Sequence, residues 1–347
     1  MKLLVITQKI DRNDTILGFF HDWVLKMSDK FEKVEVICLQ KGEYSFPENV
    51  RVYSLGKSAS TSDSPMRRGK FQYVFNFYKH LSSLDGTYDK VFVHMNEEYV
   101  LLAGIYWKIK GIPVYFWRNH AKGSFLTLVS VWFSTKVFCT STKSFTASFS
   151  KTVIMPAGVN TEIFKISEIF IRKKYSICMV GRVSPVKHIE LALESVNILV
   201  KNGNQVSLSI VGDVPQIDLE YFEGLKKYVE DNDLSKIVSF QGGVSLDKLP
   251  EVYSGHEICL NLTDAGSFDK TIVEATGCGA VPLVSSDSFI GLLPEVCITL
   301  PVSTNIAIAL EKLLEPESQI RIQKDLENFV ESQSLSKMME KLVIEIK

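Results

Sequence analysis

The chain has 347 residues, 46% of them hydrophobic, and a net charge of −1, so it is long enough for two domains that each bury a core. Its six cysteines lie far apart and form no CxxC pair, so neither a zinc site nor a disulfide framework is expected. This pattern favours a reduced, cytosolic setting. No apolar run approaches the roughly 20 residues of a membrane-spanning helix, and the first residues are typical of a strand, not of a signal peptide. Any membrane contact is therefore expected to be peripheral.

The small net charge conceals two unlike halves. Residues 1–165 contain 22 Lys and Arg against 14 Asp and Glu, whereas the remaining residues contain 17 basic and 26 acidic ones. A basic first half indicates contact with an anionic surface, such as membrane lipid or a lipid-linked acceptor. Because the chain has no dense basic run, plain surface composition stays open as the alternative.

The first half alternates apolar runs with stretches of helical spacing. Strands are expected near 3–6, 34–39, 50–55, 90–94, 113–117, 137–140 and 152–155, and helices near 16–30, 66–84, 96–110 and 125–133. Gly18 lies near the first helix start, after a polar loop. His120 lies just past the carboxyl end of the strand at 113–117, where it is expected to face the ligand-binding edge; a surface-loop histidine is the alternative.

Two of these helices have features of helices that contact a membrane. The helix at 66–84 carries basic residues beside aromatic ones, which is typical of a helix lying on a membrane, although core packing of the aromatic residues is the alternative. The helix at 125–133 is apolar throughout, and at nine residues it is predicted to be buried or interfacial.

The second half repeats the alternation. Strands are expected near 175–180, 206–211, 237–240, 258–262, 280–284 and 297–300, and helices near 187–201, 217–230, 246–253, 268–277, 302–316, 318–332 and 335–345. Strands alternating with helices in both halves predict an α/β protein of two Rossmann-like, doubly wound parallel-sheet domains, 1–165 and 166–347. Loops at the carboxyl ends of both sheets are expected to face a central cleft.

A stretch in the second half has the features of an anion site. A buried strand at 258–262 leads through a polar loop into a helix whose first residues are Asp269, Lys270, Thr271 and Ile272. The free amides and the dipole at such a helix start favour phosphate. Glu274 lies further along the helix, where a carboxylate suits sugar hydroxyls; a solvated helix residue is the alternative.

Two basic residues lie at another helix start. Arg182 follows Gly181, and Lys187 comes five residues later. A guanidinium and an ammonium there could hold two phosphates of one diphosphate, each charge-assisted hydrogen bond contributing roughly 1.5–3 kcal/mol. If a nucleoside diphosphate leaves in the reaction, the pair also stabilises the developing charge. An unrelated surface pair is the alternative.

These motifs resemble those of retaining glycosyltransferases of family four, which have the GT-B fold. The specific part of the resemblance lies in the second half: Gly181-Arg182 with Lys187, Ile210-Val211-Gly212-Asp213, Phe240-Gln241-Gly242-Gly243-Val244, and Glu274-Ala275 with Gly279. In the first half Gly18, His120 and Pro156-Ala157-Gly158-Val159-Asn160 match in position.

The resemblance implies a role for each of these residues. Arg182 and Lys187 bind the donor pyrophosphate and act in catalysis, together with His120 beside the sugar. Glu274 holds the ribose hydroxyls, and the backbone of 270–272 meets the donor phosphates or sugar. Val244 contacts the base through its main chain, and Gly18 approaches the donor from the first domain.

One position departs from the family pattern. Gly266 stands where the family has the first of two glutamates, so an acidic contact to the sugar is expected from Asp264 or Asp269 instead.

The resemblance implies a hexosyltransferase-like enzyme that moves a sugar from a UDP- or GDP-sugar to a glycan or lipid-linked acceptor, with retention, in polysaccharide or glycolipid biosynthesis. The first domain is expected to take the acceptor and the second the donor, with the last helix packing back on the first. Neither a metal, another cofactor nor a nucleic-acid partner is expected, and the expected location is the cytoplasm, at the inner face of the membrane. Alternatives are a catalytically lapsed nucleotide-sugar-binding subunit and a GT-B epimerase or phosphorylase.

Overall fold

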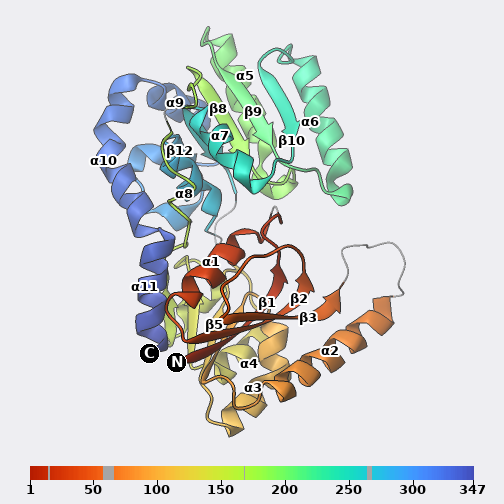
Figure 1. Ribbon diagram of the computed structural model, residues 1–347. Coiled ribbons are helices and arrows are strands. Elements are labelled where there is room, and N and C mark those ends of the chain that lie inside the picture. Colours follow the sequence, from red (N-terminus) through yellow and green to blue (C-terminus); the bar gives the residue numbers. More distant parts are fainter. Residues whose placement is uncertain (15, 58–65, 168, 264–267) are drawn as a thin grey trace. The chain divides into compact units, whose positions relative to one another are not determined.

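The computed structural model describes residues 1–14, 16–57, 66–167, 169–263 and 268–347. The chain divides into two compact units (Figure 1). The first unit comprises Met1–Gly158 together with Met338–Lys347, and the second comprises Val159–Lys337.

The first unit is built on a seven-stranded parallel sheet with the order β3-β2-β1-β4-β5-β6-β7. Its strands are β1 (Lys2–Ile10), β2 (Lys33–Lys41), β3 (Val50–Lys57), β4 (Lys90–His94), β5 (Val114–Trp117), β6 (Lys136–Cys139) and β7 (Thr152–Ile154). In the centre, Val5 of β1 lies opposite Val36 of β2 and Phe92 of β4. All three side chains are fully buried, as expected of a parallel sheet covered on both faces.

Helices cover both faces of this sheet. They are α1 (Phe19–Ser28), α2 (Met66–Ser83), α3 (Glu97–Ile109) and α4 (Phe125–Phe133). Residues such as Phe77, Trp107 and Val131 place α2, α3 and α4 on one face, where they share a single apolar core with the strands. Figure 1 shows α1 on the opposite face.

The last helix, α11 (Leu335–Ile346), ends against the first sheet. Its carbonyl at Ile346 accepts hydrogen bonds from Lys90 Nζ and from the Tyr115 hydroxyl, and Lys136 Nζ lies 2.7 Å from the Glu345 carboxylate. Two lysines therefore lie at the negative end of this helix dipole, a favourable place for positive charge.

The second unit is built on a five-stranded parallel sheet with the order β10-β9-β8-β11-β12. Its strands are β8 (Ser176–Val180), β9 (Ser207–Val211), β10 (Val238–Gly242), β11 (Ile258–Asn261) and β12 (Val281–Val284). Its helices are α5 (Ile189–Lys201), α6 (Leu219–Asp231), α7 (Leu249–Ser254), α8 (Lys270–Gly277), α9 (Ser303–Leu313) and α10 (Pro316–Ser332). Two parallel sheets with helices confirm the predicted α/β class.

One predicted strand is wrong. The run at 297–300 forms no strand; only Ile298 makes an isolated bridge, with Val284, after a short 3-10 helix at Glu295–Cys297. The 3-10 turn uses the N–H groups of Cys297 and Ile298, which donate to the carbonyls of Pro294 and Glu295 at 2.9 and 3.0 Å, whereas the Thr299 N–H donates to Val284 at 2.9 Å.

In the described part of the chain, no helix combines the length and the apolar character needed to cross a bilayer.

Candidate functional site

The carboxyl ends of β8 and β9 approach each other unusually closely. Gly212 has a φ of 156°, and a Cβ added there would lie 1.9 Å from the Gly181 carbonyl oxygen. Gly181 itself has a φ of 139°, and a Cβ there would lie 3.2 Å from Lys187 Cε. Only glycine fits both the conformation and the space. The predicted Gly181-Arg182 motif therefore turns the chain so that the Lys187 side chain can lie across the end of β8.

Lys187 makes an ion pair that joins two loops. Its Nζ lies 2.5 Å from Asp269 Oδ2 and donates to Thr263 Oγ1 at 3.0 Å. The Asn261 amide, at the end of β11, donates to the same Asp269 oxygen at 2.8 Å. Because β8 and β11 are neighbours in the sheet, residues 82 positions apart in sequence meet at one edge.

Asp269 also caps α8. Its Oδ1 accepts hydrogen bonds from the backbone N–H of Thr271 at 3.3 Å and from the Thr271 hydroxyl at 2.9 Å. Burial disfavours its charge, but the charge of Lys187 and the hydrogen bonds from Lys187, Asn261 and Thr271 outweigh burial and lower the pKa of Asp269 to about 2. The α8 start therefore already holds an anion, supplied by the protein itself.

Glu274 lies inside the second unit, on α8. Its side chain is 7% exposed, and the Tyr253 hydroxyl of α7 donates to its Oε2 at 3.1 Å. The alternative that Glu274 is a solvated helix residue is therefore wrong. Burial raises its pKa to about 7, although the Lys270 charge and the Tyr253 hydrogen bond act in the opposite direction. Burial also lowers the pKa of Lys270 to about 7, against the charge of Glu274.

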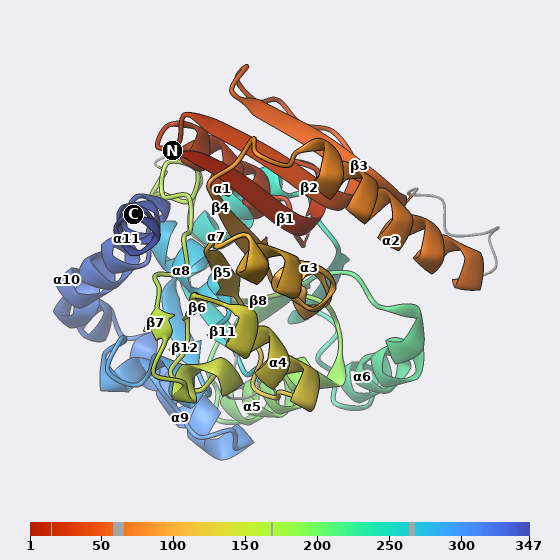
Figure 2. The ribbon, with the colours of Figure 1, turned by 90° about the horizontal axis from the view of Figure 1, so that it is seen from below.

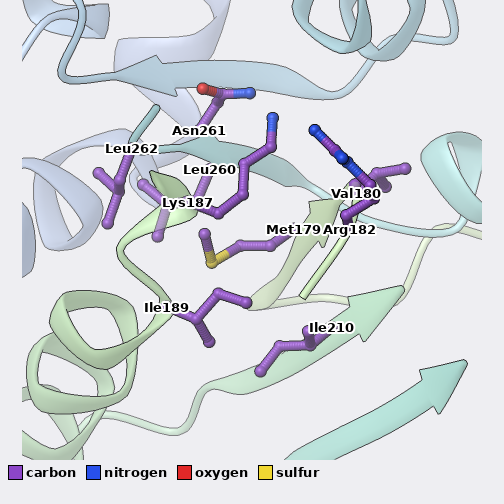
Figure 3. Close-up of a pocket in the computed structure, with 10 residues that line it drawn as sticks. Met179, Val180, Arg182, Lys187, Ile189, Ile210, Leu260, Asn261 and Leu262 are labelled. Atoms are coloured by element: carbon purple, nitrogen blue, oxygen red, sulfur yellow. The ribbon is translucent and has the colours of Figure 1, made fainter. Parts of the chain in front are cut away.

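A small pocket lies beneath the charged side chains (Figure 3). Figure 3 shows the nitrogen ends of Lys187 and Arg182 extending to the same side as the Asn261 amide. The apolar lining of the pocket includes Met179, Ile189, Ile210, Leu260 and Leu262. Its volume of about 10 Å³ is room for roughly one water, far below the space of a ligand cavity.

Arg182 differs from Lys187 in its surroundings. Its side chain is exposed, and within the described residues its guanidinium makes no ion pair. The two predicted cations thus lie at one pocket, one held by Asp269 and the other open to solvent.

Val244 follows β10 in a loop that the end of β9 holds in place. The Asp213 carboxylate accepts a hydrogen bond from the Gly243 N–H at 3.0 Å, and the Gly212 N–H donates to the Gly242 carbonyl at 2.8 Å. Val244 itself is partly buried. Asp213 thus positions the loop that carries Val244.

Gly18 and His120 belong to the first unit. Gly18 precedes α1, and a Cβ there would lie 2.5 Å from the Asp14 carbonyl oxygen, so this close turn excludes larger residues. His120 follows β5; partial burial of its ring and the charge of Arg118 lower its pKa, while Glu97 raises it. A neutral imidazole at neutral pH follows from this balance.

Sequence reasoning missed three contributors, Asn261, Thr263 and Tyr253. Asn261 offered one signal, because it is the polar last residue of an otherwise apolar strand. The predicted positions Asp264 and Gly266 lie outside the described residues. Within the described ranges, no three His, Cys, Asp or Glu side chains gather so that they could hold a metal ion.

Residues 160–341, more than half of the chain, match the model of the family described as glycosyl transferases group 1. The chain belongs to this family. It is therefore a nucleotide-sugar-dependent glycosyltransferase, which confirms the predicted enzyme class. No curated protein matches the glycosyltransferase at a significant level.

Solved structures with low sequence identity share the fold. HepE of Anabaena, solved with UDP and glucose, is 17% identical, with a TM-score of 0.76 over 99% of this chain and 98% of that one. Sucrose-phosphate synthase of Thermosynechococcus elongatus is 14% identical, with a TM-score of 0.75 over 99% and 97%. WaaG, a glycosyltransferase of lipopolysaccharide biosynthesis, is 14% identical, with a TM-score of 0.65 over the full length of both chains. These likenesses confirm the predicted GT-B fold.

Proposed function

We propose that the enzyme transfers a hexose from a UDP- or GDP-sugar to a glycan or lipid-linked acceptor, with retention of configuration and without a metal. The observation that carries the proposal is the convergence of Lys187, the exposed Arg182 and the start of α8 at one edge of the second sheet. HepE, which shares the fold, was solved with UDP and glucose. Retention rests on the resemblance to family four.

In this proposal the donor pyrophosphate competes with Asp269 for Lys187. Asp269 offers one negative charge to the ammonium, whereas a pyrophosphate offers more charge and more acceptor oxygens. Arg182, which no carboxylate holds within the described residues, supplies a bidentate partner for the second phosphate. As the bond to the sugar breaks, charge builds up on the departing diphosphate, and both cations stabilise it.

Glu274 is proposed to bind the donor ribose. Its buried carboxyl, held by Tyr253, is already oriented. Sugar hydroxyls that donate to this carboxylate favour its charged form and therefore lower its pKa from about 7. Backbone atoms of Lys270, Thr271 and Ile272 then contact the phosphates or sugar, and Val244 contacts the base.

Asp269 is assigned a positioning role and not the sugar contact expected from the sequence. Both of its oxygens are engaged, one by Lys187 and Asn261 and the other by Thr271. We infer that it holds Lys187 and the start of α8 in place before the donor arrives.

The acceptor side is proposed for the first unit, with His120 beside the transferred sugar and Gly18 at the donor. A neutral His120 could accept or donate a hydrogen bond to that sugar. The excess of basic residues in 1–165 supports a lipid-linked acceptor and a peripheral contact with an anionic membrane.

The test is a thermal-shift and turnover screen of UDP, GDP and their hexose conjugates. We expect one nucleoside diphosphate to raise the melting temperature, because a ligand that binds the folded state stabilises it. Arg182→Ala is expected to abolish most of this shift and to lower turnover roughly 10- to 100-fold, whereas Arg182→Lys keeps part of both. Unchanged binding and turnover in Arg182→Ala would exclude the assigned pyrophosphate site.

A further inference from the structure

Three helices of the first unit turn an outer surface to solvent. The inner sides of α2, α3 and α4 pack on one face of the seven-stranded sheet, through Phe77, Trp107 and Val131, all at most 4% exposed. Figure 2 looks onto these three helices from the side away from the sheet. Their outer sides therefore form a surface that the sheet does not cover.

Helix α4 turns several apolar residues to solvent and two polar residues inward, although Val131 packs in the core. Phe125, Leu128 and Trp132, spaced three and four residues apart, are 75%, 42% and 61% exposed. Thr127 and Ser130 instead point inward, where their hydroxyls donate to Glu97 of α3, at 2.7 Å and 3.4 Å. A surface helix of a water-soluble domain ordinarily turns its apolar residues to the core. An exposed apolar stripe of this kind marks an interaction surface.

Helix α3 extends the stripe. A Cβ at Gly104 would lie 2.6 Å from the Phe133 ring, so the two helices pack closely. Next to α4, α3 exposes Ile105 and Ile109, at 60% and 81%. Lys108 of α3 places its ammonium 3.2 Å from the centre of the Trp132 ring. The apolar stripe and a positive charge thus belong to one surface, which we call the α3–α4 face (Ile105, Lys108, Ile109, Lys122, Phe125, Leu126, Leu128 and Trp132).

Helix α2 adds a second apolar row beside this face. Phe71, Phe75 and Tyr78 are exposed at helical spacing, and the Tyr78 hydroxyl donates to the Leu102 carbonyl of α3 at 2.7 Å. Aromatic residues on this helix are therefore divided: Phe77 is in the core and Tyr73 packs against it, as one interpretation of the sequence held, whereas Phe71, Phe75 and Tyr78 face outward.

The charge of the region is mostly positive. From Tyr99 to Thr161 the chain contains no Asp or Glu but seven Lys and Arg, and the two acidic residues of α3, Glu97 and Glu98, lie in its first turn, where Glu97 pairs with Arg118 at 3.2 Å. Lys108 is exposed on α3, and Lys122 is exposed in the loop that leads into α4. Two copies of the chain joined through this face would bring lysines against lysines, which is unfavourable. The complementary partner is an apolar surface covered by negative charge.

We propose that the α3–α4 face docks on an anionic phospholipid bilayer, with α4 lying in the plane of the interface. Phe125, Leu128 and Trp132 enter the boundary between headgroups and acyl chains, and Lys108 and Lys122 bind headgroup phosphates. This inference rests on the peripheral membrane contact of the proposed function and names the surface that makes it; it does not depend on the donor site.

Trp132 provides a built-in probe. The other three tryptophans, Trp23, Trp107 and Trp117, are at most 1% exposed, so quenchers in lipid reach Trp132 first. We expect the full chain to bind phosphatidylcholine vesicles that contain phosphatidylglycerol, with a blue shift of the emission and quenching by brominated acyl chains. High salt should weaken this binding. Absence of both spectral changes on the anionic vesicles would overturn the proposal.

Paired variants separate the contributions. Phe125→Ser with Leu128→Ser is expected to lower the vesicle partition coefficient roughly tenfold or more. Ile217→Ser with Ile308→Ser, which changes two residues of the second unit that are 91% and 67% exposed, should leave it unchanged. Lys108→Gln and Lys122→Gln should each lower it roughly fivefold on anionic vesicles and hardly at all on neutral ones.

The remaining outcomes contradict the proposal. Equal losses of vesicle binding in the two serine double variants would show that exposed apolar residues bind lipid wherever they lie on the protein, and not through one defined face. A concentration-dependent dimer that only Phe125→Ser with Leu128→Ser dissolves would assign the face to a second copy. Nucleoside diphosphate binding, measured on the same samples by melting temperature, tests the donor site separately; if it persists without vesicle binding, only the membrane surface is wrong.

Discussion

Each unit contains a lysine–aspartate pair, one in the loop ahead of α1 and the other at the start of α8, and the two pairs differ in how far apart their partners lie in the sequence. In the first unit Lys9 Nζ lies 2.5 Å from Asp14 Oδ2, and Asp14 Oδ1 accepts hydrogen bonds from the backbone N–H of Ile16 and Leu17, ahead of α1. In the second unit Lys187 lies 2.5 Å from Asp269, which caps α8. The partners are five residues apart in the first pair and 82 in the second.

Both aspartates are held as anions, for related reasons. Burial opposes the charge of Asp14, but hydrogen bonds from Lys9, Leu17 and Ile16 outweigh it and lower the pKa. Around Lys9, burial is likewise outweighed, by the hydrogen bonds and charges of Asp14 and Asp11, so the pKa of Lys9 is raised. The first pair therefore folds one loop upon itself.

The second pair couples separate parts of the sheet. Asp269 gathers Lys187 from the β8 loop, Asn261 from the end of β11 and Thr271 from α8. A ligand that takes Lys187 away from Asp269 therefore acts on two loops and a helix start together. The difference indicates that a local pair stabilises one loop, whereas a long-range pair joins separate elements at the edge of the sheet. Under the proposed function, a donor phosphate exchanges with Asp269 for Lys187 there.

The largest expected effect is the difference in catalytic activity between variants of the two lysines. Lys187→Ala should lower kcat/KM at least 100-fold, because about 1.5–3 kcal/mol of charge-assisted binding is lost together with stabilisation of the leaving diphosphate. Lys9→Ala, the matched change in the first unit, should lower it less than about fivefold and act mainly on stability. Steady-state kinetics at varied donor concentration measure both. Equal losses in the two variants would remove the functional distinction between the pairs.

A smaller effect concerns the buried carboxyl of α8 and its pH dependence. Burial raises the pKa of Glu274 to about 7, from an ordinary 4.5. The folded state thus binds this proton more tightly than the unfolded chain, so the contribution to stability is complete below pH 4.5 and is lost as pH rises toward 7. A shift of this size corresponds to roughly 3 kcal/mol.

Glu274→Gln should remove that slope while keeping a group that can accept from Tyr253. Chemical denaturation between pH 4.5 and 7 is the measurement, with donor KM expected to rise roughly tenfold for the loss of a charged hydrogen-bond acceptor. If the variant keeps the wild-type slope, Glu274 is not the group that titrates.

The sequence predicted the sheets well and the partners of the site poorly. Apolar runs such as 3–6 and 258–262 are long enough to indicate buried parallel strands. Arg182, Lys187 and Glu274 could be predicted as site residues because of their spacing from glycines in the sequence. Thr263 could not be predicted, because its contact with Lys187 depends on β8 lying beside β11, and no local sequence pattern gives the order of strands in a sheet. Asn261 contacts Asp269 within the connection between β11 and α8. The burial of Glu274 likewise depends on α7, which packs over α8 and supplies Tyr253.

The smallest expected effect is the difference in stability between variants of the two aspartates, Asp269 and Asp14. Asp269→Asn keeps a good helix cap but loses the charge that holds Lys187, so the free energy of unfolding should fall by about 1–3 kcal/mol at neutral pH. Asp14→Asn should cost about 1 kcal/mol or less, because its partner is nearby in sequence and the pair joins parts of one loop only. The folded pKa of Asp269 is about 2, below its ordinary 3.8, so its contribution is present above pH 3.8 and is lost as pH falls toward 2. Denaturation at pH 7 and at pH 3 should therefore show the gap between wild type and Asp269→Asn closing in acid, and a gap that stays constant would mean that the ion pair does not carry it.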